Sequence, residues 1–385
     1  MALSKIDVAN MLTGLVPNDN TIRRPLSKPI IINGDCSVSQ RGTANTDESS
    51  SGFYRVDRMN VGLSNCGEFR LSQETLTSGN AYNAGFKKAF RIDCAVADAS
   101  PASGDIANMT YKLEGNSVQV FKKGTSNAEK YTLAFWVKSN KTGTAQVNLV
   151  DGDNSRQVGA TYTISSANTW EHKVLNYPAD TTGASDNDNN KSLEIEWALD
   201  AGSDFTSGAV PSAWESSSNA DRSVNDLALQ DNTANDWAIT GIQLEVGEFS
   251  STTLPPFQFE DFGDNLARCQ RYYQKPVYSK DHQGTTEEYS AFNTGTYSAD
   301  AYFRVARPLG VEMRANPTLV SSSGTNYFFI LSGANDDIND VTLHNDSNFK
   351  TVWVYNNDEA SSTAGQAGIL MANNTSAYIA FDAEL

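Results

Sequence analysis

Residues Ile242–Lys275, IQLEVGEFSSTTLPPFQFEDFGDNLARCQRYYQK, decide how this chain is divided. The stretch opens with Ile242, Leu244 and Val246 alternating with polar residues, a pattern that predicts a strand with one buried side. A polar connection that contains two adjacent prolines follows and interrupts the strand pattern. We therefore expect one β domain to finish here.

The spacing of the apolar residues then changes from that of a strand to that of a helix. Phe262, Leu266, Cys269 and Tyr273 fall at intervals that place them on one helical stripe. Aspartates at the beginning and arginines at the end of this segment match the helix dipole. The sequence therefore predicts a short linking helix between two β domains.

Short strand patterns alternate with polar turns on both sides of this joint. We predict a mainly β chain: an antiparallel jelly-roll sandwich, the linking helix and a second, smaller β-sandwich, preceded by a short N-terminal helix. The expected parts are an attachment segment at 1–28, a jelly-roll domain at 29–249, the linker and helix at 250–275, and a C-terminal sandwich at 276–385. Predicted strands include Phe53–Met59, Val118–Lys122, Tyr131–Ser139, Leu193–Leu199, Tyr289–Asn293 and Ala299–Val305.

Composition excludes several classes of partner. The net charge is −17 and no run of Lys or Arg is longer than two, so neither nucleic acid nor an anionic membrane is expected. No apolar run reaches the roughly 20 residues of a membrane helix, and we expect no secretory signal peptide. The four cysteines, Cys36, Cys66, Cys94 and Cys269, form no CxxC pair, which favours buried free thiols over a disulfide framework.

The N-terminal segment carries a second helical stripe, formed by Val8, Met11, Leu12 and Leu15. A helix of about ten residues is marginal in water by itself. It therefore needs a partner surface, which is either its own domain, a sister subunit or a larger assembly. We expect it to anchor the chain.

Few residues are arranged as in known catalytic sites. His172, His282 and His344 have no nearby nucleophile motif, and GxSxG is absent. Glu194 and Glu196 lie on one face of a predicted strand, a spacing compatible with a carbohydrate enzyme but also with any half-exposed acidic strand. Surface histidines and a non-catalytic strand remain the simpler interpretation.

Two acidic turns offer the hard oxygen ligands that calcium prefers. They contain Asp151 with Asp153, and Asp186 with Asp188, but neither has the full EF-hand pattern. A structural calcium is therefore one interpretation and solvated turns are the other. No other cofactor is expected.

Aromatic residues are the remaining candidates for binding, because a sugar ring can stack on a flat indole. Trp136 and Trp197 are predicted on the polar faces of their strands, where they could form a platform or be covered by a loop. Trp214 lies in a long polar loop at 201–233, for which we expect a contact role.

Several segments together resemble virion proteins of tailed bacteriophages, marine ones in particular, such as tail-fibre and other structural proteins with a jelly roll like that of carbohydrate-binding modules. They are ALSKIDVANMLTG at 2–14, IINGDCSVSQRGT at 31–43, FYRVDRM at 53–59, QLEVG at 243–247 with LPPFQFEDFGDNLARCQRYYQK at 254–275, and AYIAFDAEL at 377–385. They cover about a fifth of the chain and occur in the expected order. The pair QLEVG and CQRYY is the most specific.

The resemblance implies a non-enzymatic virion appendage, a tail fibre or similar, attached through residues 1–28. It further implies tail or capsid proteins as partners, a homotrimer, a location in the virion and contact with a host-surface glycan. The chain lacks a repetitive shaft and coiled-coil heptads, which favours a compact appendage. Two alternatives remain: a purely structural capsid or tail decoration, and a polysaccharide-degrading enzyme that uses Glu194 and Glu196.

Overall fold

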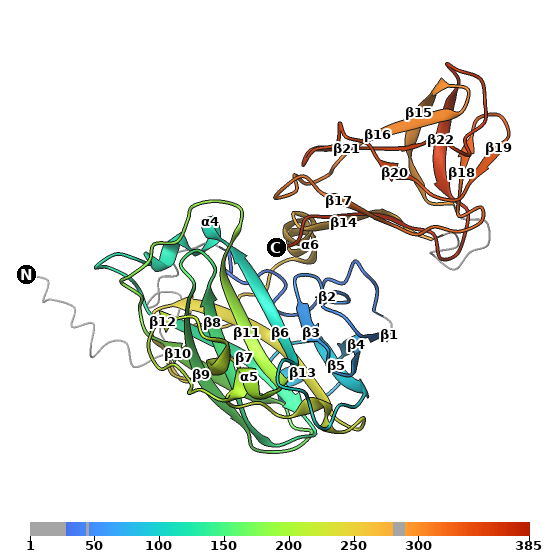
Figure 1. The fold of residues 1–385 in the computed structure, drawn as a ribbon. Coiled ribbons are helices and arrows are strands. Elements are labelled where there is room, and N and C mark those ends of the chain that lie inside the picture. Colours follow the sequence, from blue (N-terminus) through green and yellow to red (C-terminus); the bar gives the residue numbers. More distant parts are fainter. Residues whose placement is uncertain (1–27, 44–45, 280–288) are drawn as a thin grey trace, which may run out of the picture. The chain divides into compact units, whose positions relative to one another are not determined.

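The computed structural model describes residues 28–43, 46–279 and 289–385. Within them the chain is mainly antiparallel β-strand with few helices, which confirms the predicted fold class (Figure 1). The anchoring residues Val8, Met11, Leu12 and Leu15 lie outside the described residues. No helix among the described residues is both long and apolar enough to cross a membrane.

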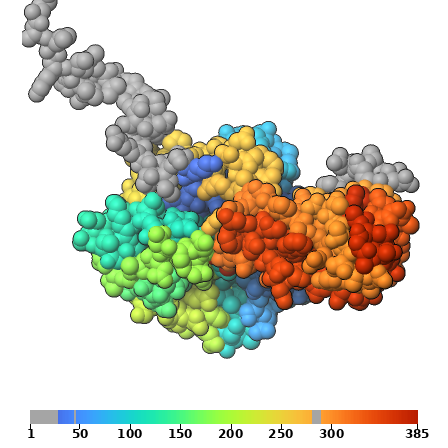
Figure 2. Space-filling model, turned by 90° about the horizontal axis from the view of Figure 1, so that it is seen from above, coloured from blue at the N-terminus to red at the C-terminus, as the bar shows by residue number. Residues whose placement is uncertain are grey.

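The chain forms two compact units. The first takes in residues up to Ser37, Asn45–Gly52 and Asn60–Glu260, and the second takes in Val38–Ala44, Phe53–Met59 and Asp261–Leu385. Figure 2 shows the surface coloured along the sequence, and the C-terminal segments of the second unit are those in orange through red. The second unit thus combines the predicted C-terminal sandwich with two short segments from early in the sequence.

The first unit is a sandwich of two sheets. The six-stranded sheet has the order β1 (Thr46–Glu48), β4 (Glu68–Thr75), β5 (Lys88–Val96), β13 (Asp236–Val246), β7 (Tyr131–Ser139), β10 (Glu171–Tyr177). The seven-stranded sheet has the order β12 (Glu215–Ser216), β9 (Arg156–Ile164), β8 (Gly143–Asp151), β11 (Lys191–Ala201), β6 (Ile106–Glu114), β3 (Asn60–Ser64), β2 (Gly52–Phe53). The chain passes repeatedly from one sheet to the other between β5 and β13, as in a jelly roll.

Alternation along the strands builds the core between these sheets. Phe135 on β7 contacts Trp197 on β11 and Tyr162 on β9, with ring centres 5.8 and 5.2 Å apart. All three side chains are buried. The large apolar side chains of both sheets therefore interlock in one layer, which is the usual arrangement of a β-sandwich.

Short helical turns lie in the connections of the first unit. They are α3 (Asn80–Asn83), α4 (Gly115–Val118), η1 (Gln119–Phe121), α5 (Ser203–Thr206), η2 (Asn219–Asp221) and η3 (Leu229–Asp231). The prediction of a strand at Val118–Lys122 is therefore wrong. The side-chain amide of Gln119 donates to the carbonyl of Gly115 at 2.9 Å, and Lys122 ends the helical turn with a positive φ of 51°.

The main part of the second unit, Asp261–Leu385, opens with α6 (Phe262–Gln270), which confirms the linking helix. Its buried side consists of Asn265 and Cys269, whereas Phe262 is 57% exposed and Tyr273 already belongs to the next strand. Of the predicted apolar stripe, Phe262 is therefore exposed, Leu266 is half-buried, and Cys269 and Tyr273 are buried. Asp261 caps the helix by accepting a hydrogen bond from the backbone of Gly263 at 2.8 Å.

Two sheets form the body of the second unit. The smaller has the order β14 (Tyr273–Val277), β23 (Ile379–Asp382), β17 (Thr318–Ser321). The larger has the order β19 (Asn335–Ile338), β18 (Phe328–Leu331), β22 (Ala367–Ala372), β15 (Ala291–Ala299), β16 (Tyr302–Pro308), β21 (Thr351–Asn356), β20 (Thr342–Leu343). Buried side chains from both sheets, including Ile379, Phe381, Phe303 and Val354, form one hydrophobic cluster.

The two early segments are tied into the second unit by polar contacts. The side-chain amide of Gln40 donates to the carbonyl of Tyr273 at 2.8 Å, and Arg41 pairs with Asp382 at 3.0 Å. Arg58 pairs with Glu384. The predicted strand Phe53–Met59 is strand only at its first residue, and later in the same segment Arg58 makes the ion pair with Glu384. Four of the segments that resemble virion proteins therefore contribute to one structural unit.

The four cysteines are free thiols, as predicted. Cys36, Cys94 and Cys269 are buried, and Cys66 is half-buried. Burial raises the pKa of the Cys94 thiol to about 11 and that of Cys66 to about 12, so both stay protonated at neutral pH.

Candidate functional site

The candidate site lies on the outer face of the seven-stranded sheet of the second unit. In β16 and β21, Phe303, Val305, Val352 and Val354 point into the core, so Tyr302 and its alternate neighbours point outward. Strand pairing then aligns the outward residues, because Tyr355 lies opposite Arg304 on one side and opposite Thr342 on the other. Three strands thereby present their polar and aromatic side chains together.

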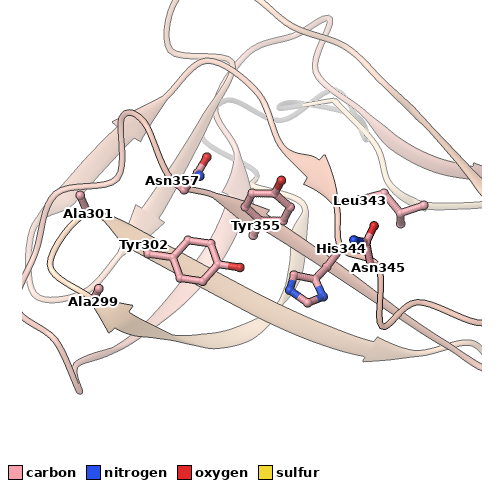
Figure 3. A pocket seen from close by; sticks show the side chains of 8 residues that line it. All are labelled: Ala299, Ala301, Tyr302, Leu343, His344, Asn345, Tyr355 and Asn357. Carbon is pink, nitrogen blue, oxygen red and sulfur yellow. The ribbon is translucent and has the colours of Figure 1, made fainter.

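A cavity of about 460 Å³ opens on this face, and we call it the tyrosine pocket. It is lined by Ala299, Ala301, Tyr302, Leu343, His344, Asn345, Tyr355 and Asn357 (Figure 3). The ring centre of Tyr355 lies 5.5 Å from that of Tyr302 and 5.7 Å from that of His344, both in edge-to-face geometry. The three half-buried rings therefore form an aromatic wall with open faces and edges.

Polar groups complete the tyrosine pocket. Asn345 and Asn357 are exposed, and each amide offers both donors and an acceptor. His344 Nδ1 lies 3.2 Å from the backbone nitrogen of Asp346 and 3.4 Å from the Asp346 carboxylate, so Asp346 occupies this side of the imidazole ring. The pocket thus combines flat apolar surface with several hydrogen-bonding groups, and none of the described residues that line it is acidic.

Trp136, which the sequence proposed for glycan binding, lies half-buried on the outer face of the six-stranded sheet of the first unit. Its indole stacks on the exposed His172 directly across from it, with ring centres 4.9 Å apart. Phe86 and Phe257 pack in the same cluster and cover part of that face. The glycan-binding role of Trp136 stays a prediction.

The prediction that Trp197 stands on a polar face is wrong. Trp197 is 0% exposed, because it shares the inward side of β11 with Ile195, while Glu194 and Glu196 point the other way. Its Nε1 has no hydrogen-bond partner among the described residues. A ligand at the surface cannot reach this indole.

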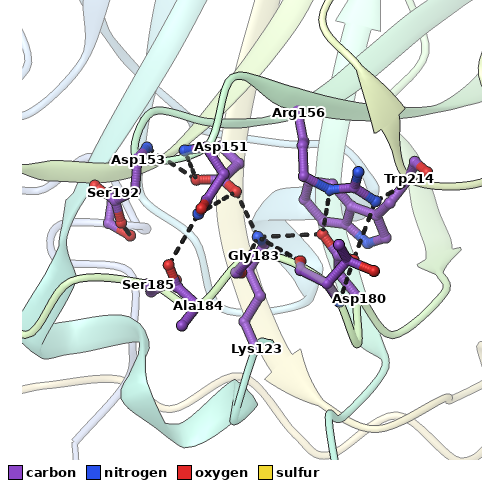
Figure 4. A network of polar contacts seen from close by, with 12 residues as sticks. Lys123, Asp151, Asp153, Arg156, Asp180, Gly183, Ala184, Ser185, Ser192 and Trp214 are labelled. Atoms are coloured by element: carbon purple, nitrogen blue, oxygen red, sulfur yellow. Dashed lines mark hydrogen bonds and ion pairs between the residues drawn. The ribbon is translucent and has the colours of Figure 1, made fainter. Parts of the chain in front are cut away.

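Trp214 is half-buried and covers a buried network of ion pairs, which Figure 4 shows. Its Nε1 donates to the carbonyl of Pro178 at 2.9 Å, and Lys123 Nζ lies 5.3 Å from its ring centre. These contacts hold the indole within the first unit, and contact with a glycan stays a prediction.

The ion-pair network occupies the place where the sequence offered a calcium site. The ammonium of Lys123 pairs with Asp151 and, at 3.1 Å, with Asp180, and it donates to the carbonyl of Gly183 at 2.6 Å (Figure 4). Arg156 donates to Asp180 at 2.9 Å. Burial raises the pKa of Asp180, but the hydrogen bonds from Arg156, the Thr182 backbone and Lys123 outweigh it and hold this pKa below its usual range.

The four predicted metal ligands do not converge. Asp153 accepts a hydrogen bond from the Asp186 backbone at 2.9 Å, and Asp188 accepts one from the backbone of Asn190 at 2.9 Å. No group of three acidic, histidine or cysteine side chains among the described residues can hold a metal ion. Backbone N–H groups and Lys123 engage Asp151, and backbone N–H groups engage Asp153 and Asp188, so the structure adds no support to the calcium site predicted at Asp151, Asp153, Asp186 and Asp188.

Glu194 and Glu196 share the outer face of β11, as predicted, but both are engaged. Glu196 is 1% exposed and accepts from Arg222 at 2.9 Å, while Lys191 pairs with Glu194 at 2.6 Å. Burial raises the pKa of Glu196, although Arg222 opposes the shift. The long loop at 201–233 supplies Arg222 and so covers this part of the sheet.

One sequence pattern indicates part of the tyrosine pocket. Trp353 and Tyr355 alternate with the apolar Val352 and Val354, so an aromatic outer face could be read from that strand alone. His344, interpreted as a surface histidine, is half-buried and lines the pocket. Nothing in the sequence shows that Tyr302 lies beside them.

No protein-family model and no curated protein matches the chain. Among solved structures, the chain is similar to the enzymatically active domain of tailspike protein 4 of bacteriophage CBA120, at TM-score 0.27 and 13% identity over 57% of this chain and 21% of that chain. It is also similar to the family 11 carbohydrate-binding module of a Clostridium thermocellum cellulosomal cellulase, at TM-score 0.26 and 8% identity over 54% of this chain and 98% of that one. The chain thus spans about a fifth of the tailspike domain's length. At these TM-scores the likenesses carry no argument about function.

Proposed function

We propose that the chain is a non-enzymatic glycan-binding appendage of a phage particle, and that the tyrosine pocket takes a sugar ring. The observation that carries the glycan part is the aromatic wall formed by Tyr302, His344 and Tyr355. The apolar C–H face of a sugar packs on such rings, which offer large rigid area at small entropic cost. The amides of Asn345 and Asn357 stand at the same cavity, where sugar hydroxyls need donors and acceptors.

The pocket is suited to binding and not to cleavage. Glycoside hydrolysis normally needs two carboxyl groups about 5–10 Å apart across the bond that breaks. The tyrosine pocket is lined by no Asp or Glu, and the alternative pair, Glu194 and Glu196, is neutralised by Lys191 and Arg222. A shallow site of this kind has modest affinity, and a homotrimer would strengthen attachment to a surface by binding at several points.

A glycan array with the full chain tests the proposal. We expect binding to a subset of glycans and a loss of about fivefold in affinity in Tyr355→Ala and in Tyr302→Ala, since stacking is worth on the order of 1 kcal/mol per ring. Phe349→Ala is the matched control, because Phe349 is an exposed aromatic of the same unit outside the pocket. Equal loss in the control, or full binding by Tyr355→Ala, contradicts the site.

The outcome also separates the two alternatives. A folded chain that binds no glycan supports a purely structural decoration. Release of reducing ends from a polysaccharide that is lost in Glu196→Gln supports an enzyme. Attachment is tested separately by deleting residues 1–28, which should leave both described units folded but prevent incorporation into particles.

A further inference from the structure

A second cavity of the second unit lies beside β14 and the start of β23. Its volume is about 400 Å³, and we call it the lysine pocket. Lys275, Tyr278 and Tyr378 line it together with Gln40 and the hydroxyl residues Thr375 and Ser376. It shares no lining residue with the tyrosine pocket.

The central feature of the lysine pocket is an ammonium group between two aromatic rings. Lys275 Nζ lies 4.8 Å from the ring centre of Tyr378 and 5.3 Å from that of Tyr278. Within the part of the chain that the structure describes, no carboxylate or hydrogen-bond acceptor reaches this ammonium. Partial burial, together with the nearby charge of Arg55, lowers the pKa of Lys275, so the charged form gains from an anion beside it.

The acidic side chains around this cavity are already used. Asp382 and Glu384 pair with Arg41, and Glu384 also pairs with Arg58. Buried Asp57 accepts from the side chain and the backbone of Gln40. These carboxylates face Arg41, Arg58 and Gln40, whereas the ammonium of Lys275 faces the two tyrosine rings in the wall of the cavity.

Gln40 adds a polar acceptor to the same wall. Its side-chain nitrogen donates to Asp57 and to the carbonyl of Tyr273, which fixes the orientation of the amide. Its side-chain oxygen accepts no hydrogen bond from a described residue, and the hydroxyls of Thr375 and Ser376 likewise have no partner there. These groups match the hydroxyls of a sugar, which both donate and accept.

We propose that the lysine pocket binds a sugar that carries a carboxylate, a uronic acid residue of an acidic polysaccharide. Lys275 pairs with the carboxylate, the tyrosine rings pack on the sugar ring, and Gln40 accepts from a hydroxyl. The volume falls within the roughly 300–1,000 Å³ of small-molecule sites and exceeds what a bare inorganic anion fills. At physiological salt, charges more than about 8 Å away are largely screened, so the distant acidic residues do not prevent the contact.

Two ligands that differ only in charge test this inference with the full-length chain. Isothermal titration with trigalacturonic acid is compared with titration of its neutral methyl ester. We expect the acid to bind at least about tenfold more tightly, with an affinity that falls as salt is added, because a charge-assisted contact is lost in the ester. Lys275→Met should abolish the difference, and Lys275→Arg should keep it.

Lys350→Met is the matched control, because Lys350 is an exposed lysine of the same unit that pairs with Glu312 at 2.8 Å. It should keep the preference for the acid. Equal affinity for acid and ester overturns the inference, as does a preference that survives in Lys275→Met. If inorganic sulfate binds the wild-type chain as tightly as trigalacturonic acid does, the inference that the ligand is a sugar is wrong. Tyr355 does not line the lysine pocket, so Tyr355→Ala leaves that pocket intact. The acid-against-ester comparison therefore tests the lysine pocket, and Tyr355→Ala on the glycan array tests the tyrosine pocket, so one proposal can fail without the other.

Discussion

Arg58 and Glu384 form an ion pair although they are 326 residues apart in the sequence. Their side chains are only 1% and 4% exposed. The guanidinium of Arg58 also lies 3.4 Å from the ring centre of Tyr272. A segment from early in the sequence is thus held in the second unit by charge and by stacking.

Removing one partner of this pair should destabilise the second unit. Glu384→Gln leaves Arg58 buried without its carboxylate, so we expect the free energy of unfolding to fall by about 3 kcal/mol in urea denaturation. Asp47→Asn is the control, since Asp47 and Arg70 form a pair at 2.6 Å in which both side chains are exposed. The control should unfold like wild type. Equal behaviour of both variants would show that burial does not matter here.

The lysine network of the first unit allows a sharper comparison, because two adjacent lysines differ in burial. Lys123 is 3% exposed, whereas Lys122 is 53% exposed and pairs with Glu129 at 2.6 Å. Lys123→Met leaves buried Asp151 without its ammonium partner and Asp180 with Arg156 as its cation, and should cost about 3 kcal/mol of unfolding free energy. Lys122→Met should change it little. Differential scanning calorimetry of the two variants checks this, and an unchanged Lys123→Met transition would contradict the network.

Asp200 should make the stability of the first unit depend on pH. Burial raises the pKa of Asp200 to about 6, although the backbone N–H of Gln230 donates to it at 2.8 Å. The unfolded value is near 4, so the contribution of this group is fully present below pH 4 and is lost as the pH rises through 6. Asp200→Asn keeps an acceptor for Gln230 and removes the titration.

We therefore expect Asp200→Asn to be more stable than wild type at pH 7 and to vary less in stability between pH 4 and 7. Denaturation at a series of pH values measures both quantities. Asp204→Asn is the control, because Asp204 is exposed in the same unit and its replacement should leave the wild-type pH profile in place. A steeper profile in Asp200→Asn would contradict the assigned direction.

Two fully buried tryptophans differ in one hydrogen bond. Trp237 Nε1 donates to the hydroxyl of Tyr162 at 3.2 Å, whereas Trp197 Nε1 has no partner among the described residues. Trp237→Phe and Trp197→Phe remove similar volumes, but only the first breaks a buried hydrogen bond. We expect Trp237→Phe to lower the unfolding free energy by about 1 kcal/mol more than Trp197→Phe. Urea denaturation of both variants checks the order.

The fold class followed from the sequence because side-chain alternation is a local property. The strand pattern at Tyr131–Ser139 and the linking helix reappear in the structure at nearly the predicted residues. The sequence does not show which polar faces of the strands are covered by other segments of the chain. Gln243 and Glu245 were expected on an open face, yet they are buried, because Gln243 bonds to Glu245 and to the carbonyl of Pro255.

The candidate site was not found from the sequence because it depends on pairing between strands. Tyr302, His344 and Tyr355 come from three strands or their ends, and only the register of β16, β21 and β20 brings them together. Trp197 was misassigned for a related reason. Trp197 was placed on the same face as the neighbouring Glu194 and Glu196. Side chains alternate along β11, so Trp197 lies on the opposite face of the sheet.

The interleaved path of the chain has a consequence for how the protein is made. Residues 38–44 and 53–59 leave the ribosome early, but the partners of Arg41 and Arg58 are Asp382 and Glu384. The second unit therefore cannot complete these ion pairs until translation has reached Glu384.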